Sequence, residues 1–504
     1  MKAIKLRILP SLALCATAIL LVACGKQDDP AAEAPSDAAA TTVAKVPLST
    51  ASEVARELYV QGQSLADDLH FVDANAAFAQ AVEADPAFAM GYVMLAQTSQ
   101  TATEFFDAVD KASEHAAHAS EGEQLIIRAV VAASENDQAA QHDALTQLVA
   151  KFPQDERTHM RLGNYLNGQQ DFAGAIEHYK HATSINSGFA GAYNALGYAY
   201  RSLEDFDSAK NAFAKYVELL PDEANPYDSY AELLMEMGDY EESIANYRKA
   251  LEINSSFPSA YAGISINESL KGETELAQEA AEQGLAAARN FAERQGAMFR
   301  SVTSHLFAGN TEAAMEMSNT MLAEAEVKGN HAAMGGVLEY MGDIMLVAGE
   351  PAKAEEYYDS ALEQRMQAGF NEANEAQAKR THLFKTAIAA MIADDAETAA
   401  TRTAEYIAAA EVHGTGFEKR RIHELSAFLA QYNEDLDAAA EHFDQASQLE
   451  PVVLYWSART QAALGNTDRA IDLATRAANR NTLSANLPFF RSDALALLAE
   501  LNAG

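Results

Sequence analysis

The chain has 504 residues, 49% of them apolar and 22% charged, so it is long enough to build more than one hydrophobic core. Its formal net charge of −37 argues against direct nucleic-acid binding, because neutralising phosphates requires clustered Lys and Arg side chains. With only 12 prolines among abundant Ala, Glu and Leu, the composition favours helices over strands.

Residues 1–23 are expected to be a targeting segment and not part of the fold. Lys2, Lys5 and Arg7 form a basic start, and an apolar run over residues 12–22 follows it. This run is shorter than the ~20 residues that a membrane-spanning helix needs. The segment therefore predicts a cleaved signal peptide.

The end of this segment, Leu21-Val22-Ala23-Cys24-Gly25, resembles the lipobox of bacterial lipoproteins, in which the Cys thiol receives a diacylglycerol. The resemblance implies lipidation of Cys24. Because Gly25 rather than Asp follows, it also implies an anchor in the outer membrane of a Gram-negative bacterium, facing the periplasm. The alternatives are an ordinary secretory signal or membrane helix with an incidental Cys24, or a cytoplasmic protein.

Residues 24–50 are expected to be the acylated Cys followed by a flexible tether. They are rich in Ala, Asp, Pro and Thr and show no apolar periodicity. The folded part is therefore predicted to stand off the membrane but to remain near it.

The chain then repeats a pattern of small and large apolar positions every 34 residues, most clearly over residues 190–221. Each unit contains two stretches with apolar residues at helical spacing, which predicts a helical hairpin. Gly197 and Ala209 are small where the two helices must approach closely, and Phe213 fills the space beside them. Pro221 cannot continue the second helix and ends the unit.

This pattern resembles the tetratricopeptide repeat (TPR). The resemblance implies an all-α, TPR-type α-solenoid of stacked antiparallel hairpins, wound as a right-handed superhelix of roughly twelve units. A regular array is expected over residues 51–288, irregular TPR-like hairpins over 289–425, and further TPR units with a capping helix over 426–504.

The sequence lacks the common catalytic motifs, including a P-loop, H-E-x-x-H and G-x-S-x-G, so neither an enzyme, a cofactor nor a metal site is expected. Two histidine pairs at helical spacing, His115/His118 and His178/His181, are expected on solvated helix faces. The basic run 419–421 is expected on a solvated face as well, pairing with Glu418 and Glu424.

The resemblance also implies a concave groove, lined by the first helices of the hairpins, that binds segments of other proteins. Its candidate lining residues are Arg157, Met160, Asn164, Asn167, Asn194, Tyr198, Arg201, Asn225, Asp228, Glu232 and Met235. Amide side chains can hydrogen-bond a peptide backbone without reading its sequence. A merely solvated groove is the alternative.

We expect a membrane-anchored, non-catalytic scaffold or adaptor that binds other proteins or peptides of the bacterial envelope. The alternative is a ligand-binding or enzymatic role for residues 289–425, where departures from the repeat leave room for a pocket. The sequence leaves open which partner is bound, which pathway is served, the oligomeric state and whether the protein faces the periplasm or the outside.

Overall fold

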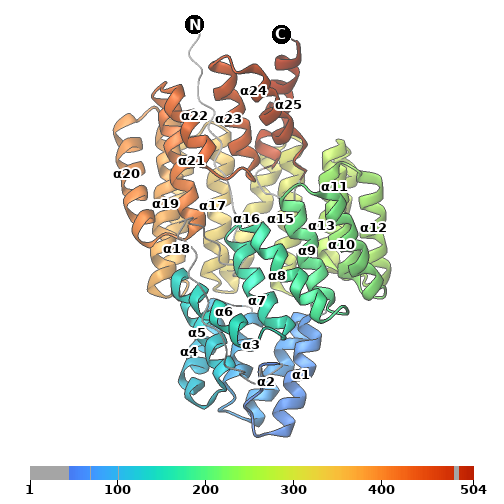
Figure 1. The fold of residues 1–504 in the computed structure, drawn as a ribbon. Coiled ribbons are helices and arrows are strands. Elements are labelled where there is room, and N and C mark those ends of the chain that lie inside the picture. Colours follow the sequence, from blue (N-terminus) through green and yellow to red (C-terminus); the bar gives the residue numbers. More distant parts are fainter. Residues whose placement is uncertain (1–44, 68–69, 100, 482–486, 504) are drawn as a thin grey trace, which may run out of the picture. The chain divides into compact units, whose positions relative to one another are not determined.

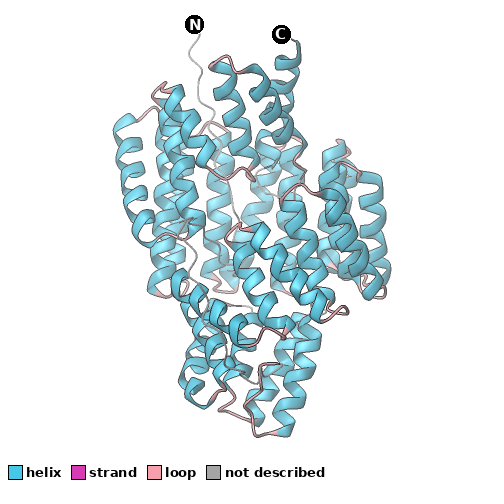
Figure 2. Ribbon diagram, in the orientation of Figure 1, coloured by secondary structure: helices cyan, strands magenta, loops and turns pink. Residues whose placement is uncertain are grey.

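The computed structural model describes residues 45–67, 70–99, 101–481 and 487–503. Within these residues the chain forms 25 α-helices, one 3-10 turn and no strand (Figure 2). The predicted all-α fold is therefore confirmed. The predicted signal segment and Cys24 lie outside the described residues.

The described chain divides into two compact units: an N-terminal unit of residues 45–221 with 415–417, and a C-terminal unit of residues 222–414 and 418–503 (Figure 1). This division falls after Pro221, inside the array of 51–288 that the sequence predicts to be continuous.

The N-terminal unit consists of five helical hairpins. Its helices are α1 (Glu53–Asp67), α2 (Phe71–Ala84), α3 (Ala89–Thr98), α4 (Ala102–His115), α5 (Glu121–Ser134), α6 (Gln138–Lys151), α7 (Glu156–Gly168), α8 (Phe172–Ile185), α9 (Ala190–Ser202) and α10 (Phe206–Leu219), with the 3-10 turn η1 (Ala116–His118) after α4. Each odd-numbered helix packs against the helix that follows it, as the sequence predicts.

The C-terminal unit consists of seven further hairpins and a final helix. Its helices are α11 (Ala224–Met237), α12 (Tyr240–Ile253), α13 (Pro258–Lys271), α14 (Thr274–Ala287), α15 (Phe291–Phe307), α16 (Thr311–Val327), α17 (His331–Val347), α18 (Pro351–Met366), α19 (Glu372–Ile392), α20 (Ala396–His413), α21 (Gly416–Tyr432), α22 (Leu436–Gln445), α23 (Pro451–Ala463), α24 (Thr467–Asn479) and α25 (Leu487–Ala503). The twelve hairpins agree with the predicted number of units.

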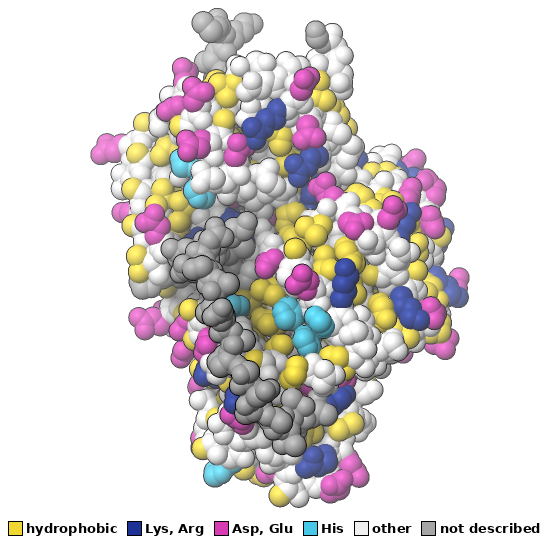
Figure 3. All heavy atoms as spheres, in the orientation of Figure 1, with side chains coloured by type: hydrophobic (Ala, Val, Ile, Leu, Met, Phe, Trp, Pro, Cys, Tyr) yellow, Lys and Arg dark blue, Asp and Glu magenta, His cyan; other side chains and the backbone are white. Residues whose placement is uncertain are grey.

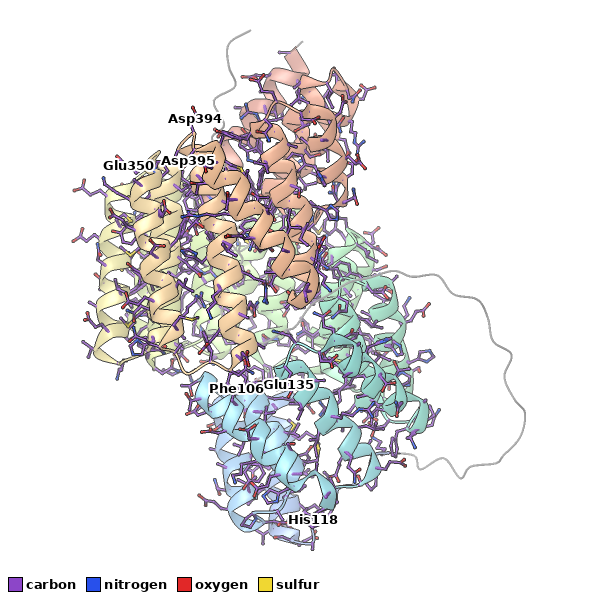
Figure 4. The ribbon with its side chains drawn as sticks, turned by 90° about the vertical axis from the view of Figure 1, so that its left-hand side faces the viewer. Phe106, His118, Glu135, Glu350, Asp394 and Asp395 are labelled. Atoms are coloured by element: carbon purple, nitrogen blue, oxygen red, sulfur yellow. The ribbon has the colours of Figure 1, made fainter. Side chains whose placement is uncertain are left out.

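A residue with left-handed backbone ends the first helix of most hairpins, and the spacing of these residues records the repeat. In five consecutive hairpins they are Asn136, Gln170, Glu204, Gly238 and Gly272, each 34 residues after the last. The next residue then lies at the N-cap of the second helix, as where the Asp205 carboxylate accepts a hydrogen bond from the Ser208 N–H (3.1 Å). In Figure 4 the turns at Glu350 and at Asp394 and Asp395 lie at the same end of neighbouring hairpins.

Close approach inside a hairpin depends on a glycine that faces an aromatic ring. A Cβ placed on Gly197 would lie 2.5 Å from the Phe213 ring, and one on Gly163 would lie 2.6 Å from Tyr179. Both contacts are far shorter than ordinary carbon–carbon contacts. The predicted roles of Gly197 and Phe213 are therefore confirmed.

The region that the sequence marks as irregular is built from regular hairpins of longer helices. The helices α7 to α14 have 13 or 14 residues, whereas α15 to α20 have 16 to 21. About one added turn per helix stretches the period beyond 34 residues without breaking the stack. Met298, Tyr358 and Phe384 from this region share one core cluster.

The final helix α25 does more than cap α24. Within the C-terminal unit it also contacts α15, and the Phe489 ring lies 5.9 Å from that of Tyr340 in α17. The Arg491 guanidinium donates to the Tyr240 hydroxyl (3.3 Å) and the Leu270 carbonyl (3.5 Å). The end of the chain thus returns to the first hairpins of its own unit.

Residues 45–50, predicted to belong to the flexible tether, instead lie along the N-terminal unit. Their hydrogen bonds reach the end of the first hairpin and the starts of the third and fourth, from Thr50 Oγ1 to Asp85 Oδ2 (2.6 Å), from Ser49 N to Glu123 Oε1 (3.1 Å) and from Val46 N to Asp155 Oδ2 (2.9 Å). Carboxylates at helix ends fix this segment, so the tether prediction is wrong for these six residues.

Among the described helices, none is both long and apolar enough to cross a membrane.

Candidate functional site

Seven of the predicted groove residues lie on α7 and α9 of the N-terminal unit. Arg157 is held by a bidentate ion pair, with Nη1 3.0 Å and Nη2 2.6 Å from the Asp67 carboxylate oxygens at the end of α1. Its guanidinium also lies 5.3 Å from the centre of the Phe189 ring. Arg157 thus links the fourth hairpin to the first.

Three asparagines follow on these two helices. Asn164 is exposed, and its Oδ1 accepts a hydrogen bond from the Tyr179 hydroxyl (2.9 Å). Asn167 and Asn194 are half-buried, and neither Oδ1 atom finds a hydrogen-bond partner in the part of the chain that the structure describes. A buried acceptor left unpaired costs about 1–3 kcal/mol.

Apolar surface accompanies these amides. The Tyr198 ring is half-buried, meets the Phe213 ring edge-on at 5.1 Å and lies under the Arg201 guanidinium at 4.7 Å. Met160 is half-buried and packs against the core cluster that contains Phe189. The α7 and α9 helices therefore combine unpaired amide oxygens with partly exposed apolar groups.

The other four predicted groove residues lie on α11 of the C-terminal unit. Asn225 and Glu232 are half-buried, and Asp228 is 9% exposed with an Oδ1 atom that has no partner among the described residues. Burial, and then the Glu232 carboxylate, raise the pKa of Asp228 well above its ordinary value. Met235 is fully buried in a core cluster with Leu270, so its assignment to the groove is wrong.

A cluster of histidines joins α7 to α8, and the sequence predicts only part of it. His159 Nδ1 lies 3.1 Å from His178 Nδ1, and His159 Nε2 lies 3.1 Å from the Pro153 carbonyl oxygen. The His181 ring stacks on that of His159 at 5.1 Å. Burial, together with the neighbouring imidazoles, lowers the pKa of both His159 and His178.

The expectation of solvated histidine faces is therefore only partly met. His181 and His118 are exposed, but His178 is half-buried against His159, and the half-buried His115 stacks on the Tyr92 ring at 5.8 Å. Helical spacing in the sequence does not point to His159, because its partner His178 lies 19 residues away, across the turn of the hairpin.

A second histidine pair joins α21 to α22 in the C-terminal unit. His423 Nδ1 lies 3.3 Å from His442 Nδ1, and these two residues are also 19 apart in sequence. His178 and His442 are each followed directly by the buried aromatic of the second helix, Tyr179 and Phe443. The two pairs thus occupy the same position in their hairpins, a signal that comparing the repeats would have revealed.

Charged side chains are buried on the first helices of the C-terminal unit. Lys385 Nζ lies 2.9 Å from each oxygen of Asp343, which also accepts a hydrogen bond from the Tyr358 hydroxyl (2.7 Å). Burial raises the pKa of Asp343 to about 6, and the Lys385 ammonium opposes the rise. Such pairs are costly to break, because removal of one partner leaves a buried charge.

The basic run 419–421 belongs partly to this interior. Arg421 is 7% exposed, and its guanidinium lies 3.5 Å from the centre of the Phe384 ring. Glu418, expected to pair within its own helix, forms an ion pair with Arg380 of α19 (2.7 Å). The solvated face predicted for the run is therefore wrong for Arg421.

An open cavity of about 550 Å³ lies among α4, η1, α5 and α6, lined by residues that include Arg128 and Lys151. Both cations are engaged, Arg128 by Asp143 and Lys151 by Glu121. In the described part of the chain no group of three or more His, Cys, Asp or Glu side chains is arranged to hold a metal ion.

Three segments of the chain match models of known repeat families. Residues 190–223 and 427–485 match models of the tetratricopeptide repeat, and residues 231–264 match a model described as a TPR repeat. These segments are TPR repeats. They include the unit in which the 34-residue pattern is clearest and the C-terminal hairpins that the sequence predicts.

A curated relative shares only the repeats. A UDP-N-acetylglucosamine–peptide N-acetylglucosaminyltransferase of Giardia intestinalis is 27% identical over 124 residues. The match spans 25% of this chain and 8% of that protein.

Solved TPR structures are similar at low identity. A TPR protein from Parabacteroides merdae is 16% identical, with 52% of this chain and 98% of that one covered and a TM-score of 0.37. The Cut9–Hcn1 hetero-tetramer of the APC/C is 14% identical, with 86% and 79% covered and a TM-score of 0.41. YrrB, described as a TPR protein with an unusual peptide-binding site, is 19% identical, with 38% and 95% covered and a TM-score of 0.26.

Proposed function

We propose that this protein is a non-catalytic scaffold of the bacterial cell envelope that holds extended segments of partner proteins along the first helices of its TPR repeats. In this role the protein is held at the outer membrane by a lipid on Cys24. TPR repeats generally mediate protein–protein contacts, and a peptide-binding role needs no catalytic group.

The observation that carries this proposal is the pair of unpaired amide oxygens on α7 and α9. Asn167 Oδ1 and Asn194 Oδ1 are buried acceptors on the first helices of consecutive hairpins. Both side chains are half-buried, so each amide can turn its oxygen toward the groove, where a backbone N–H of an extended peptide would satisfy it with a gain of about 1 kcal/mol or more. Because every residue except proline carries this donor, the contact would tolerate many partner sequences.

Neighbouring side chains would supply an apolar contact. Tyr198 is half-buried between Phe213 and Arg201, and Met160 adds a flexible thioether on the preceding hairpin. A thioether adapts to side chains of different shape. The bound segment would thus gain backbone hydrogen bonds from the amides and side-chain packing from Tyr198 and Met160.

The groove is tested by photocrosslinking of the full chain in its host envelope, with a photoreactive amino acid at Tyr198. A matched control carries the same group at His118 (Figure 4), which is exposed in η1 after the second hairpin of the same unit, whereas α9 belongs to the fifth hairpin. We expect an adduct at position 198 and none of that size at position 118. The crosslinked segment, made as a peptide, should bind about 5- to 10-fold more weakly to Asn167→Ala and to Asn194→Ala.

The result that would overturn the groove assignment is a peptide affinity unchanged by both asparagine substitutions, or the same adduct from position 118.

The anchor is tested separately with Cys24→Ser. Metabolic labelling with a fatty-acid probe should label the parent chain and not the variant, and the variant should leave the membrane fraction. Labelling that persists in Cys24→Ser would disprove lipidation at this residue without bearing on the groove.

A further inference from the structure

The two histidine pairs that join first and second helices have no role in the scaffold described above. One joins α7 and α8, the other joins α21 and α22, and the two lie in different units of the chain. Figure 3 shows histidine side chains at the surface, in cyan. Their shared hairpin position and their short nitrogen–nitrogen distances call for a common explanation.

The distances match those between two ligands of one metal ion. Imidazole nitrogens bind Zn²⁺ at about 2.0–2.1 Å, so two ligands of one ion lie ~3.3 Å apart at a tetrahedral angle and ~2.9 Å apart at a right angle. The observed Nδ1–Nδ1 distances are 3.1 Å for His159 and His178 and 3.3 Å for His423 and His442. Both values fall in this interval.

The first pair is also prepared by its surroundings. His159 is 6% exposed, and its Nε2 lies 3.1 Å from the Pro153 carbonyl oxygen, to which only an N–H can donate. That bond places the His159 proton on Nε2 and leaves a lone pair on Nδ1. A backbone carbonyl that holds the second nitrogen in this way is the usual support of a metal-binding histidine.

We propose that the His159–His178 pair and the His423–His442 pair each bind one divalent transition-metal ion of the Zn²⁺ class through their Nδ1 atoms. Each ion would sit about 1.3 Å off the line that joins the two nitrogens. His178 binds the ion through its unprotonated Nδ1 and keeps its proton on Nε2. Binding therefore changes the tautomer of His178 and leaves its charge unchanged. Since no third protein ligand is arranged at either pair in the described chain, water completes the coordination.

Each ion would tie together the two helices of its hairpin. At the first pair the exposed His181 stacks on the His159 ring and shields it. Because the ion binds the folded hairpin and not the unfolded chain, it would stabilise that hairpin by an amount that rises with the logarithm of the free metal concentration once this exceeds the Kd.

The test is calorimetric titration of the full chain, purified in detergent and freed of metal, with ZnCl₂. We expect two equivalents for the parent chain, one for His178→Ala, one for His442→Ala and none for the double variant. His118→Ala, which removes an exposed histidine outside both pairs, should keep two. Circular dichroism of each variant checks that the helices remain.

Zinc should also raise the urea midpoint of the parent chain and leave that of the double variant unchanged. If an alanine variant loses helix content, His178→Asn and His442→Asn, which keep a polar side chain, replace it in the same titration. Two equivalents in the double variant, or no binding by the parent chain, would overturn the proposal and leave the pairs as hydrogen bonds between neutral imidazoles.

Discussion

The contact between Gly342 of α17 and the Tyr358 ring allows a sharp test of hairpin packing. A Cβ on Gly342 would lie 2.4 Å from that ring, more than 1 Å closer than ordinary carbon–carbon contact. The ring cannot simply move away, because its hydroxyl donates to the buried Asp343 carboxylate (2.7 Å). Overpacking of this kind costs about 1–3 kcal/mol, and Ala in place of Gly returns about 1 kcal/mol of helix propensity.

Because the Tyr358 ring is held in place, we expect an overpacking cost of about 3 kcal/mol. The free energy of unfolding of Gly342→Ala should therefore fall by about 2 kcal/mol in all. Gly336 lies on the same helix, and no atom comes within 4 Å of a Cβ added there. Gly336→Ala should therefore gain about 0.5–1 kcal/mol from propensity alone.

The sole tryptophan, Trp456, is fully buried in the same core cluster as Tyr358, so its fluorescence in a urea titration reports on this unit. Circular dichroism follows the helices in parallel. Equal midpoints for the two alanine variants, or a gain in both, would refute the reasoning. Partial recovery in Gly342→Ala/Tyr358→Leu would show that the ring is the cause.

Three further outcomes are expected. Lys385→Met should lower the free energy of unfolding by about 3–5 kcal/mol, because it leaves the Asp343 carboxylate buried without its cation. The double variant Lys385→Met/Asp343→Leu should lose less stability, and a double-mutant cycle in urea measures the difference. Since the pKa of Asp343 is raised from 3.8 to about 6, the folded state binds its proton more tightly. The stability of the parent chain relative to Asp343→Asn should therefore be highest below pH 4 and fall by up to about 3 kcal/mol as pH rises through 6. Glu204→Gly should stabilise the N-terminal unit by up to about 1 kcal/mol, because residue 204 has a left-handed backbone with a φ of 59°. Gly238→Ala, at a φ of 85°, should destabilise its hairpin for the opposite reason. Thermal unfolding followed by circular dichroism compares the two variants.

These predictions differ in how much of them is visible in the sequence. The pairing of Gly197 with Phe213 can be foreseen because it lies within one hairpin, 16 residues apart, and recurs with the period. The partners of Lys385 and Arg380 cannot, because each reaches a neighbouring hairpin through a gap whose size depends on helix length.

The candidate site divides in the same way. The sequence places Asn167, Asn194 and Tyr198 on first helices, and the structure has them there. It assigns Met235 to the groove, but the burial of a residue on a first helix depends on which hairpins close over it. Met235 lies in a core with Leu270 of the next hairpin, and its role as a core residue was decided only by that packing.

By itself, then, the sequence determined the helical hairpin, its 34-residue step and the number of hairpins, because these depend on local periodicity, turn residues and small–large pairs within one unit. Only the tertiary structure decided the rest. The docking of residues 45–50, the return of α25 to α15 and the meeting of His159 with His178 all join parts that the repeat alone does not relate. Such contacts depend on how helix lengths and crossing angles accumulate along the stack, and no single repeat encodes that sum.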